Sequence, residues 1–153
     1  MTTTTTLDVH LAHVGFTVSN LERSLQFWQE GLGLELVLLQ EKQGGYLEQI
    51  TAEPGAHALQ AHLQFPGSNL RIELLQYLKP PGTRIVARPP DVGTGHVAIL
   101  CTDLDATLAR LAQHGGRPFG SPVLIDTGLN KGSRAVYVRD PDDHIAELVQ
   151  RPA

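Results

Sequence analysis

The sequence has little of what several classes of protein require. Its 153 residues contain a single cysteine, Cys101, which excludes an intrachain disulfide. It has no run of Lys or Arg, and its 12 basic and 16 acidic residues give a net charge of −4, so neither nucleic acid nor an anionic membrane is expected as a partner. No apolar stretch approaches the roughly 18 residues of a membrane span, and no secretory signal pattern is recognisable. We therefore expect a soluble cytoplasmic protein.

Two common catalytic motifs are also absent, the Gly-rich phosphate loop and the nucleophile elbow. The composition of 41% hydrophobic and 18% charged residues is that of a chain that folds. We expect one domain over residues 9–153. Residues 1–8, which contain a threonine tract without amphipathic pattern, are expected to be a disordered tail.

An internal repeat is the most informative feature that is present. At an offset of 83, residues 13–33 align with residues 96–116 without a gap, and five of the 21 pairs are identical, among them His13/His96 and Gly33/Gly116. At an offset of 74, residues 73–76 align with residues 147–150. The repeat predicts two similar modules, residues 9–79 and 95–151, joined by a proline-rich linker over residues 80–94.

The pattern of apolar residues predicts the same order of elements in both modules. A helix follows the opening strand in each and ends at the glycines near residues 31–33 and 115–116. Strands are expected at residues 13–18, 34–40, 58–65 and 73–76, with 46–50 as an extra candidate, and at residues 96–101, 118–125, 134–138 and 147–150. The predicted fold class is α+β, with two tandem βαβββ modules.

Four polar residues occupy equivalent places in the two modules. His13 and His96 lie on the opening strands, and Glu73 and Glu147 on the closing strands. Strand alternation directs these side chains away from the face that packs on the helices. Two imidazoles and two carboxylates suit one divalent ion such as Zn, Ni, Co, Mn or Fe. Instead of binding a metal, each of these four side chains could simply be solvated at the surface, and Glu73 could form an ion pair with Arg71.

Four further residues are candidates for substrate contact. His62 shares a strand face with Gln60 and Gln64, which favours a pocket or surface role over a ligand role. A cationic side chain, Arg71, Lys131 or Arg134, could meet a substrate carboxylate or phosphate. The alternative for each of these three is a solvated surface charge.

Two segments of the sequence carry a resemblance to a known family. They are HVGFTVSNLERSLQFW at residues 13–28, with GLGL at 31–34, and RDPDDHIAEL at 139–148, where Asp143 and Ala146 replace the family's Gly and Ile. These motifs resemble those of the vicinal oxygen chelate superfamily, which includes glyoxalase I, methylmalonyl-CoA epimerase, extradiol dioxygenases and the fosfomycin and bleomycin resistance proteins. The resemblance covers Val9 to Gln150 and is greatest to the glyoxalase and epimerase-like branch.

The resemblance implies a specific site and chemistry. It implies two βαβββ modules curled around a shared cleft, where His13, His96, Glu73 and Glu147 bind one divalent metal. It also implies a homodimer and a small-molecule substrate with vicinal oxygens. The metal would stabilise an enolate or enediolate, while Glu147 or Glu73 moves a proton, with Glu48 as a candidate partner. The chain is then an isomerase or a lyase.

Two alternative functions remain open. An Fe(II)-dependent ring-cleaving dioxygenase of extradiol type needs only the triad of His13, His96 and Glu147. A small-molecule binding or antibiotic-resistance protein needs no catalysis. Glu73 favours the isomerase or lyase, because a fourth protein ligand leaves fewer metal positions open for substrate and oxygen.

Overall fold

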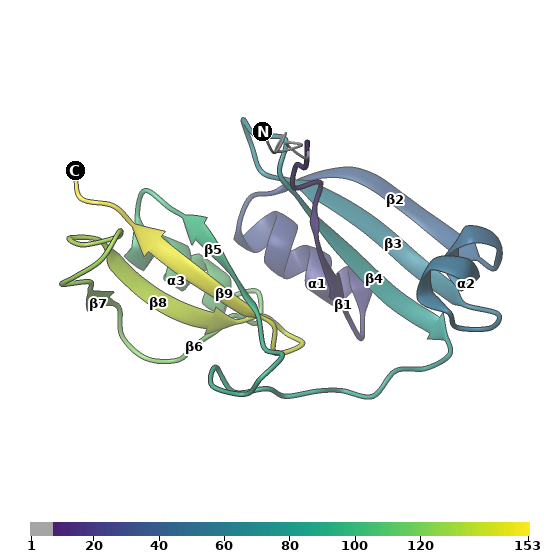
Figure 1. Ribbon diagram of the computed structural model, residues 1–153. Helices are drawn as coiled ribbons and strands as arrows, with labels where there is room; N and C mark the ends of the chain where they lie inside the picture. The colour runs from purple at the N-terminus through teal and green to yellow at the C-terminus, as the bar shows by residue number, and fades with distance from the viewer. Residues whose placement is uncertain (1–7) are drawn as a thin grey trace, which may run out of the picture.

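The computed structural model describes residues 8–153 (Figure 1), so most of the predicted tail lies outside the described residues. The first half contains β1 (Val14–Thr17), α1 (Leu21–Leu25), the π-helical turn η1 (Gln26–Gly31), β2 (Glu35–Gln43), α2 (Gly45–Thr51), β3 (His57–Gln64) and β4 (Arg71–Lys79). The second half contains β5 (His96–Leu100), α3 (Leu104–Ala112), β6 (Arg117–Pro118), β7 (Val123–Leu124), β8 (Arg134–Arg139) and β9 (Ile145–Gln150).

The two halves form two sheets with the same topology. The strand order is β1-β4-β3-β2 in the first sheet and β5-β9-β8-β6 in the second, where β7 also pairs with β8. The opening and closing strands are parallel in both sheets, and the remaining pairs are antiparallel. The predicted α+β fold of two repeated units is therefore confirmed.

Each sheet buries one face against helices. Alternate residues of β1, such as Val14 and Phe16, pack on the core, as predicted from the strand alternation. The core is continuous between the halves, because Trp28 of η1 and Leu111 of α3 belong to one buried cluster. Figure 1 shows the two sheets side by side, with α1 and α3 behind them. The opposite faces, which carry the candidate site residues, are therefore open.

Equivalent hydrogen bonds link the closing strand to the helix in both halves. The backbone N–H of Leu21 donates to Gln76 Oε1 at 2.7 Å, and that of Leu104 donates to Gln150 Oε1 at 2.8 Å. Each glutamine therefore satisfies a free donor at a helix start. Because Glu73 and Glu147 lie three residues before these glutamines, the same contacts fix the register of both glutamates.

A turn of the second half ties the halves together. Asp142 accepts hydrogen bonds from Ser19 N at 2.9 Å and from Ser19 Oγ at 2.6 Å. Arg23 forms an ion pair with the same carboxylate at 2.7 Å. The neighbouring Asp140 accepts a hydrogen bond from Trp28 Nε1 at 3.3 Å. These contacts set the relative position of the two sheets.

Three expectations about the fold need correction. The candidate strand at residues 46–50 is the helix α2. Gly44 precedes this helix and Gly45 begins it, both at positive φ, and Leu47 of the helix packs on Ala58. The expected strand at 118–125 is split into β6 and β7 around Gly120 and Pro122, because proline cannot donate to the ladder. The two sheets of one chain also do not close around a shared cleft.

No helix within residues 8–153 has both the length and the apolar character that crossing a bilayer requires.

Candidate metal centre

The first candidate pair consists of His13, just before β1, and Glu73 of β4. His13 Nε2 lies 3.3 Å from Glu73 Oε2. Gly15 stands opposite Glu73 in the β1–β4 register, and a Cβ at residue 15 would come within 3.2 Å of Oε2. The absence of a side chain at Gly15 therefore makes room for the carboxylate beside His13.

The second oxygen of Glu73 is also held by polar neighbours. Gln60 Nε2 donates to Glu73 Oε1 at 2.5 Å, and His62 Nε2 lies 3.4 Å from the same atom. Gln40 donates in turn to Gln60 Oε1. Because polar neighbours contact both of its oxygens, the Glu73 carboxylate has a fixed orientation.

Of the three histidines that lie beside Glu73 or Glu147, namely His13, His62 and His96, His62 is the most buried. Its ring meets that of His13 edge-on, with centroids 5.4 Å apart. Its Nδ1 is buried and has no hydrogen-bond partner among the described residues. Burial lowers the pKa of His62, and the nearby Glu73 only partly opposes this shift. His62 is therefore neutral at pH 7.

The second candidate pair consists of His96 of β5 and Glu147 of β9. His96 Nε2 lies 3.3 Å from Glu147 Oε2, the same separation as in the first pair. Tyr137 of β8 stands opposite Glu147, just as His62 of β3 stands opposite Glu73. The Tyr137 ring lies 5.1 Å from that of His96. Burial, and then the charge of Glu147, raise the pKa of Tyr137, so its hydroxyl stays protonated.

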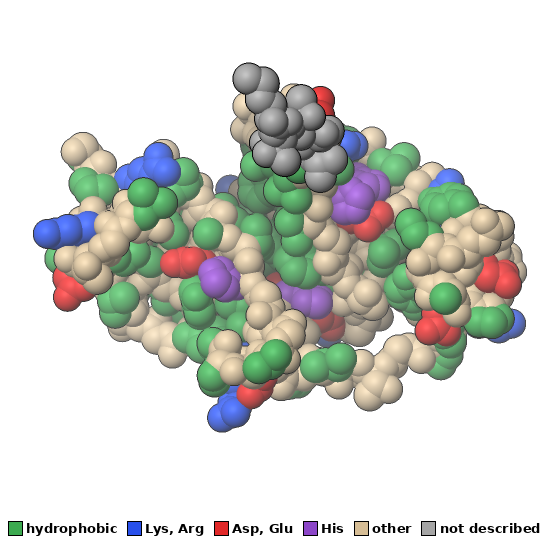
Figure 2. Space-filling view, viewed as in Figure 1, with side chains coloured by type: hydrophobic (Ala, Val, Ile, Leu, Met, Phe, Trp, Pro, Cys, Tyr) green, Lys and Arg blue, Asp and Glu red, His purple; other side chains and the backbone are tan. Residues whose placement is uncertain are grey.

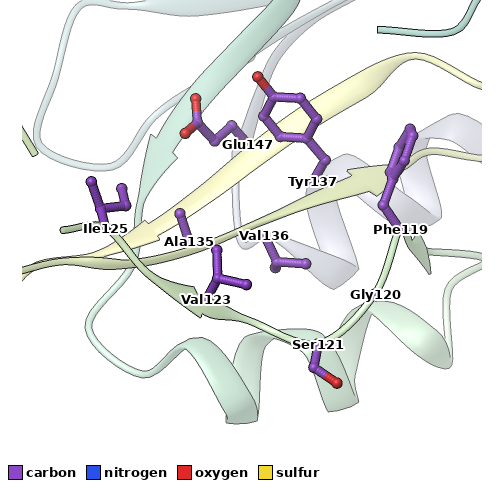
Figure 3. Close-up of a pocket in the computed structure, with 9 residues that line it drawn as sticks. All are labelled: Phe119, Gly120, Ser121, Val123, Ile125, Ala135, Val136, Tyr137 and Glu147. Atoms are coloured by element: carbon purple, nitrogen blue, oxygen red, sulfur yellow. The ribbon is translucent and has the colours of Figure 1, made fainter. Parts of the chain in front are cut away.

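A cavity of about 420 Å³ opens beside Glu147 (Figure 3). Its floor is β8, with Ala135, Val136 and Tyr137, and the segment with Phe119 and Val123 forms its wall. The side chain of Glu147, on the neighbouring strand β9, completes the lining of the cavity. The second pair therefore borders a pocket that can hold a small molecule.

The two pairs do not meet within one chain. Among residues 8–153, no group of three or more His, Cys, Asp or Glu side chains is gathered closely enough to hold a metal ion. In Figure 2, histidine and acidic side chains are adjacent at separate places over the two sheets. One chain thus presents two half-sites, each with one predicted histidine–glutamate pair, and His62 lies beside the first of them.

The structure places the other predicted residues outside these pairs. Glu48 is half-buried on α2 and makes no ion pair within the described part of the chain. Arg134 forms an ion pair with Asp105 at 2.9 Å, on the helix side of the second half. Arg71 and Lys131 are exposed, and no ion pair joins Arg71 to Glu73 within residues 8–153.

Sequence reasoning missed the residues that surround the two glutamates. Tyr137 was not a candidate, and Gln60 was noted only for sharing a face with His62. The cross-strand register identifies Tyr137, because it puts this residue opposite Glu147, and the strand face that Gln60 shares with His62 leads to Glu73, which stands opposite His62. The turn residue Asp143, which replaces the family's Gly, has φ of 73° and is held by ion pairs to Arg84 and Arg117.

Comparisons with known proteins agree with this architecture. The profile of the Glyoxalase/Bleomycin resistance protein/Dioxygenase superfamily matches residues 10–148. The chain is 34% identical over 149 residues to a 2-epi-5-epi-valiolone epimerase from Actinomyces sp., covering 95% of this chain and 81% of the epimerase. It is 28% identical over 144 residues to catechol-2,3-dioxygenase from Bacillus subtilis (strain 168), covering 92% of this chain and 41% of the dioxygenase.

The fold has a close counterpart among solved structures. A glyoxalase family protein from Bacillus cereus superposes with a TM-score of 0.85 at 23% identity, and the match covers 100% of both chains. The repeated sheets, the profile match over most of the chain and the identity to the epimerase all lead to one assignment. The chain belongs to the Glyoxalase/Bleomycin resistance protein/Dioxygenase superfamily.

Proposed function

We propose that this protein is a divalent-metal-dependent isomerase or lyase that moves a proton at a carbon next to a carbonyl group of a small molecule with vicinal oxygens. The observation that carries the proposal is the presence of two matching pairs, His13–Glu73 and His96–Glu147. These four side chains are the proposed ligands of one Zn, Ni, Co, Mn or Fe ion.

The geometry of each pair fits two ligands of one metal ion. Ligand atoms at about 2.0–2.2 Å from an ion, at angles of about 90–109°, are roughly 2.8–3.6 Å apart. Both observed Nε2–Oε2 separations are 3.3 Å. The hydrogen bond from Gln60 to Glu73 also supplies an outer partner of the kind that orients a ligating carboxylate.

Since the pairs of one chain do not meet, we propose that the site is completed by a second copy. The first pair of one copy would face the second pair of the other, and twofold symmetry would produce two identical sites per dimer. Two observations support a second copy as the occupant of the open sheet faces. Each face carries half of a four-ligand set, and no group of three or more His, Cys, Asp or Glu side chains within residues 8–153 is placed to hold a metal ion.

Glu147 is the better placed of the two glutamates to move the proton. Both oxygens of Glu73 are held, by His13 on one side and by Gln60 and His62 on the other. Glu147 contacts His96 through Oε2 and lines the cavity. A divalent ion, when bound, supplies positive charge that stabilises the negative charge developing on a substrate oxygen.

The similarity to an epimerase supports the isomerase branch of the proposal. That relative is named as an epimerase of 2-epi-5-epi-valiolone. Inverting a carbon centre next to a carbonyl requires a base to remove a proton and an acid to return one. A carboxylate beside a pocket, as at Glu147, can perform one of these steps, and inversion needs a second group on the opposite face of the carbon.

A ring-cleaving dioxygenase is the second candidate function. The similarity to catechol-2,3-dioxygenase supports it. Such an enzyme would need only the triad of His13, His96 and Glu147 as metal ligands.

Proton exchange with solvent tests the proposed function. The metal-loaded protein is incubated in D₂O, with and without oxygen, with an α-hydroxyketone, a thiohemiacetal, an acyl-CoA epimer pair and catechol. The proposal expects deuterium next to the carbonyl without oxygen, abolished by Glu147→Gln and unchanged by Glu35→Gln on the exposed part of β2. Turnover that needs both iron and oxygen would establish the dioxygenase instead, and binding without turnover would establish a binding protein.

A further inference from the structure

A second cavity, of about 430 Å³, lies where the two halves of the chain and the linker meet. Its lining comes from residues 17–19 and Tyr77 in the first half, residues 81–85 of the linker, and Asp142 and His144 in the second half. Figure 1 shows the linker running from the end of β4 along the lower side of the molecule to β5. The cavity is thus bounded by both halves and by the linker between them.

This cavity is separate from the candidate metal centre. Tyr77 lies four residues beyond Glu73 on β4. Thr17, at the end of β1, lies four residues beyond His13. Four residues of a strand span about 13 Å, and none of the four proposed metal ligands lines the cavity. A molecule bound in this cavity would therefore leave those ligands free.

Arg84 gives the cavity a fixed cation with free donors. Its Nε and Nη2 donate to Asp143 Oδ2, and Nη2 also donates to Pro141 O at 3.2 Å. These contacts orient the guanidinium group, while no hydrogen bond within residues 8–153 uses its Nη1. An oriented guanidinium group binds a carboxylate through charge-assisted hydrogen bonds. The two N–H donors of Nη1 are therefore available to an anion.

The carboxylates around the cavity are already paired. Both oxygens of Asp142 are occupied, by Ser19 and by Arg23. The turn and its partners hold three carboxylates and four guanidinium groups, which are those of Asp140, Asp142 and Asp143 and of Arg23, Arg84, Arg117 and Arg139. The surplus of one positive charge suits a ligand with one negative charge.

The rest of the lining combines hydroxyl groups with apolar side chains. The residues that line the cavity and whose hydroxyls make no hydrogen bond within residues 8–153 are Thr17, Tyr77 and Thr83. Apolar surface comes from Val18, Pro81 and Ile85. Ile85 is 80% exposed, and covering it stabilises a complex in proportion to the apolar area removed from water. The cavity therefore suits a compact molecule with one anionic end and an apolar remainder.

We propose that this cavity is a second binding site, for a small monocarboxylate, in which Arg84 binds the carboxylate and the apolar remainder lies against Val18 and Ile85. Because the lining comes from both halves and the linker, the bound ligand bridges them and stabilises their relative position. The inference is independent of the proposed reaction, since it uses none of the proposed metal ligands.

Binding of three probes to the full-length, metal-loaded protein tests the site. Benzoate, its neutral amide benzamide and inorganic phosphate are titrated by calorimetry. Benzoate is expected to bind once per chain, and about tenfold or more tightly than benzamide, because only the carboxylate gains charge-assisted hydrogen bonds. Phosphate is expected to bind more weakly than benzoate. No saturable binding of benzoate up to about 10 mM, equal binding of benzamide, or tighter binding of phosphate would overturn the inference.

Single substitutions locate the bound probe. Arg84→Gln is expected to weaken benzoate about tenfold or more and to leave benzamide unchanged. Arg88→Gln is the matched control, because this linker arginine pairs with Asp91 and does not line the cavity. Tyr77→Phe keeps the ion pair of Arg84 and is expected to weaken benzoate about threefold. The melting temperature of each variant without probe checks folding. Equal benzoate affinity in Arg84→Gln and the wild type, as for benzoate held by a metal ion, would overturn the inference.

Hydrogen exchange tests the bridging role. Bound benzoate is expected to slow amide exchange at residues 17–19, 82–85 and 142–144 together, and to leave residues 119–125 beside Glu147 unchanged. Protection confined to the linker would contradict the bridging role, and protection confined to residues 119–125 would contradict the site. Failure of proton exchange with the substrate probes would contradict the proposed function alone, because benzoate binding does not depend on it.

Discussion

Gly15 lies directly opposite Glu73 in the parallel pairing of β1 and β4, where a Cβ would come within 3.2 Å of Oε2. Gly15→Ala is therefore expected to displace the carboxylate and to weaken metal binding about tenfold, a typical effect of disturbing the support of a ligand. The measurement is a metal titration, with the melting temperature as a check on folding. Ala98→Gly, opposite Glu147 in the second sheet, is the control and is expected to leave metal affinity within about twofold.

Gln60 is expected to matter for the same reason, because it holds the other oxygen of Glu73. Gln60→Ala should reduce metal affinity about 10–100-fold, the usual range for loss of an outer hydrogen-bond partner. Gln64→Ala on the same strand face should have no effect on the same titration. Equal metal affinities for both variants and the wild type would show that Glu73 is not a ligand.

Asp142 should contribute to stability rather than to metal binding. Its carboxylate satisfies Ser19 N, Ser19 Oγ and Arg23. Asp142→Ala leaves these donors without a partner and is expected to lower the free energy of unfolding by about 1–3 kcal/mol. Urea unfolding measures the loss, with the exposed Asp126→Ala as control. A change below that of the control would contradict the proposed link between the halves.

The ion pairs of Asp143 predict a pH dependence. Burial opposes ionisation of this carboxyl, but hydrogen bonds from Arg84 and Arg117 outweigh burial, so its pKa lies below the usual 3.8. A depressed pKa stabilises the folded state above the unfolded pKa, and this contribution is lost as pH falls through the folded value.

Asp143→Asn tests this, because asparagine also tolerates the observed φ of 73°. The variant should be less stable than the wild type at pH 6, and the difference should vanish as the pH approaches 2. A difference that stays constant over this range would show that the charge of Asp143 does not stabilise the turn.

The repeat and the strand alternation were sufficient to predict the two sheets and the open faces. Val14 and Phe16 pack on the core while His13 contacts Glu73, as alternation requires. The helix α2 was missed because its apolar residues, including Leu47, are few, and the two glycines at its start, Gly44 and Gly45, also suit a turn between strands.

The separation of the two pairs could not be predicted from local patterns. It depends on how the halves pack, through contacts such as Trp28 with Asp140, which are 112 residues apart. Tyr137 was missed for a related reason. Its place opposite Glu147 follows from the register of β8 and β9, which hydrophobic periodicity does not specify.

In the proposed dimer, His13 and Glu73 of one copy share a metal with His96 and Glu147 of the other. The most direct test is to co-express His13→Ala and His96→Ala chains with different tags and purify the mixed dimer. If the site spans two chains, the mixed dimer has one site with all four ligands and one with only the two glutamates. It should bind about one high-affinity metal ion, half the wild-type number, whereas each variant alone binds none with that affinity. No high-affinity metal in the mixed dimer, with two ions in the wild-type dimer, would show that the four ligands do not come from two chains.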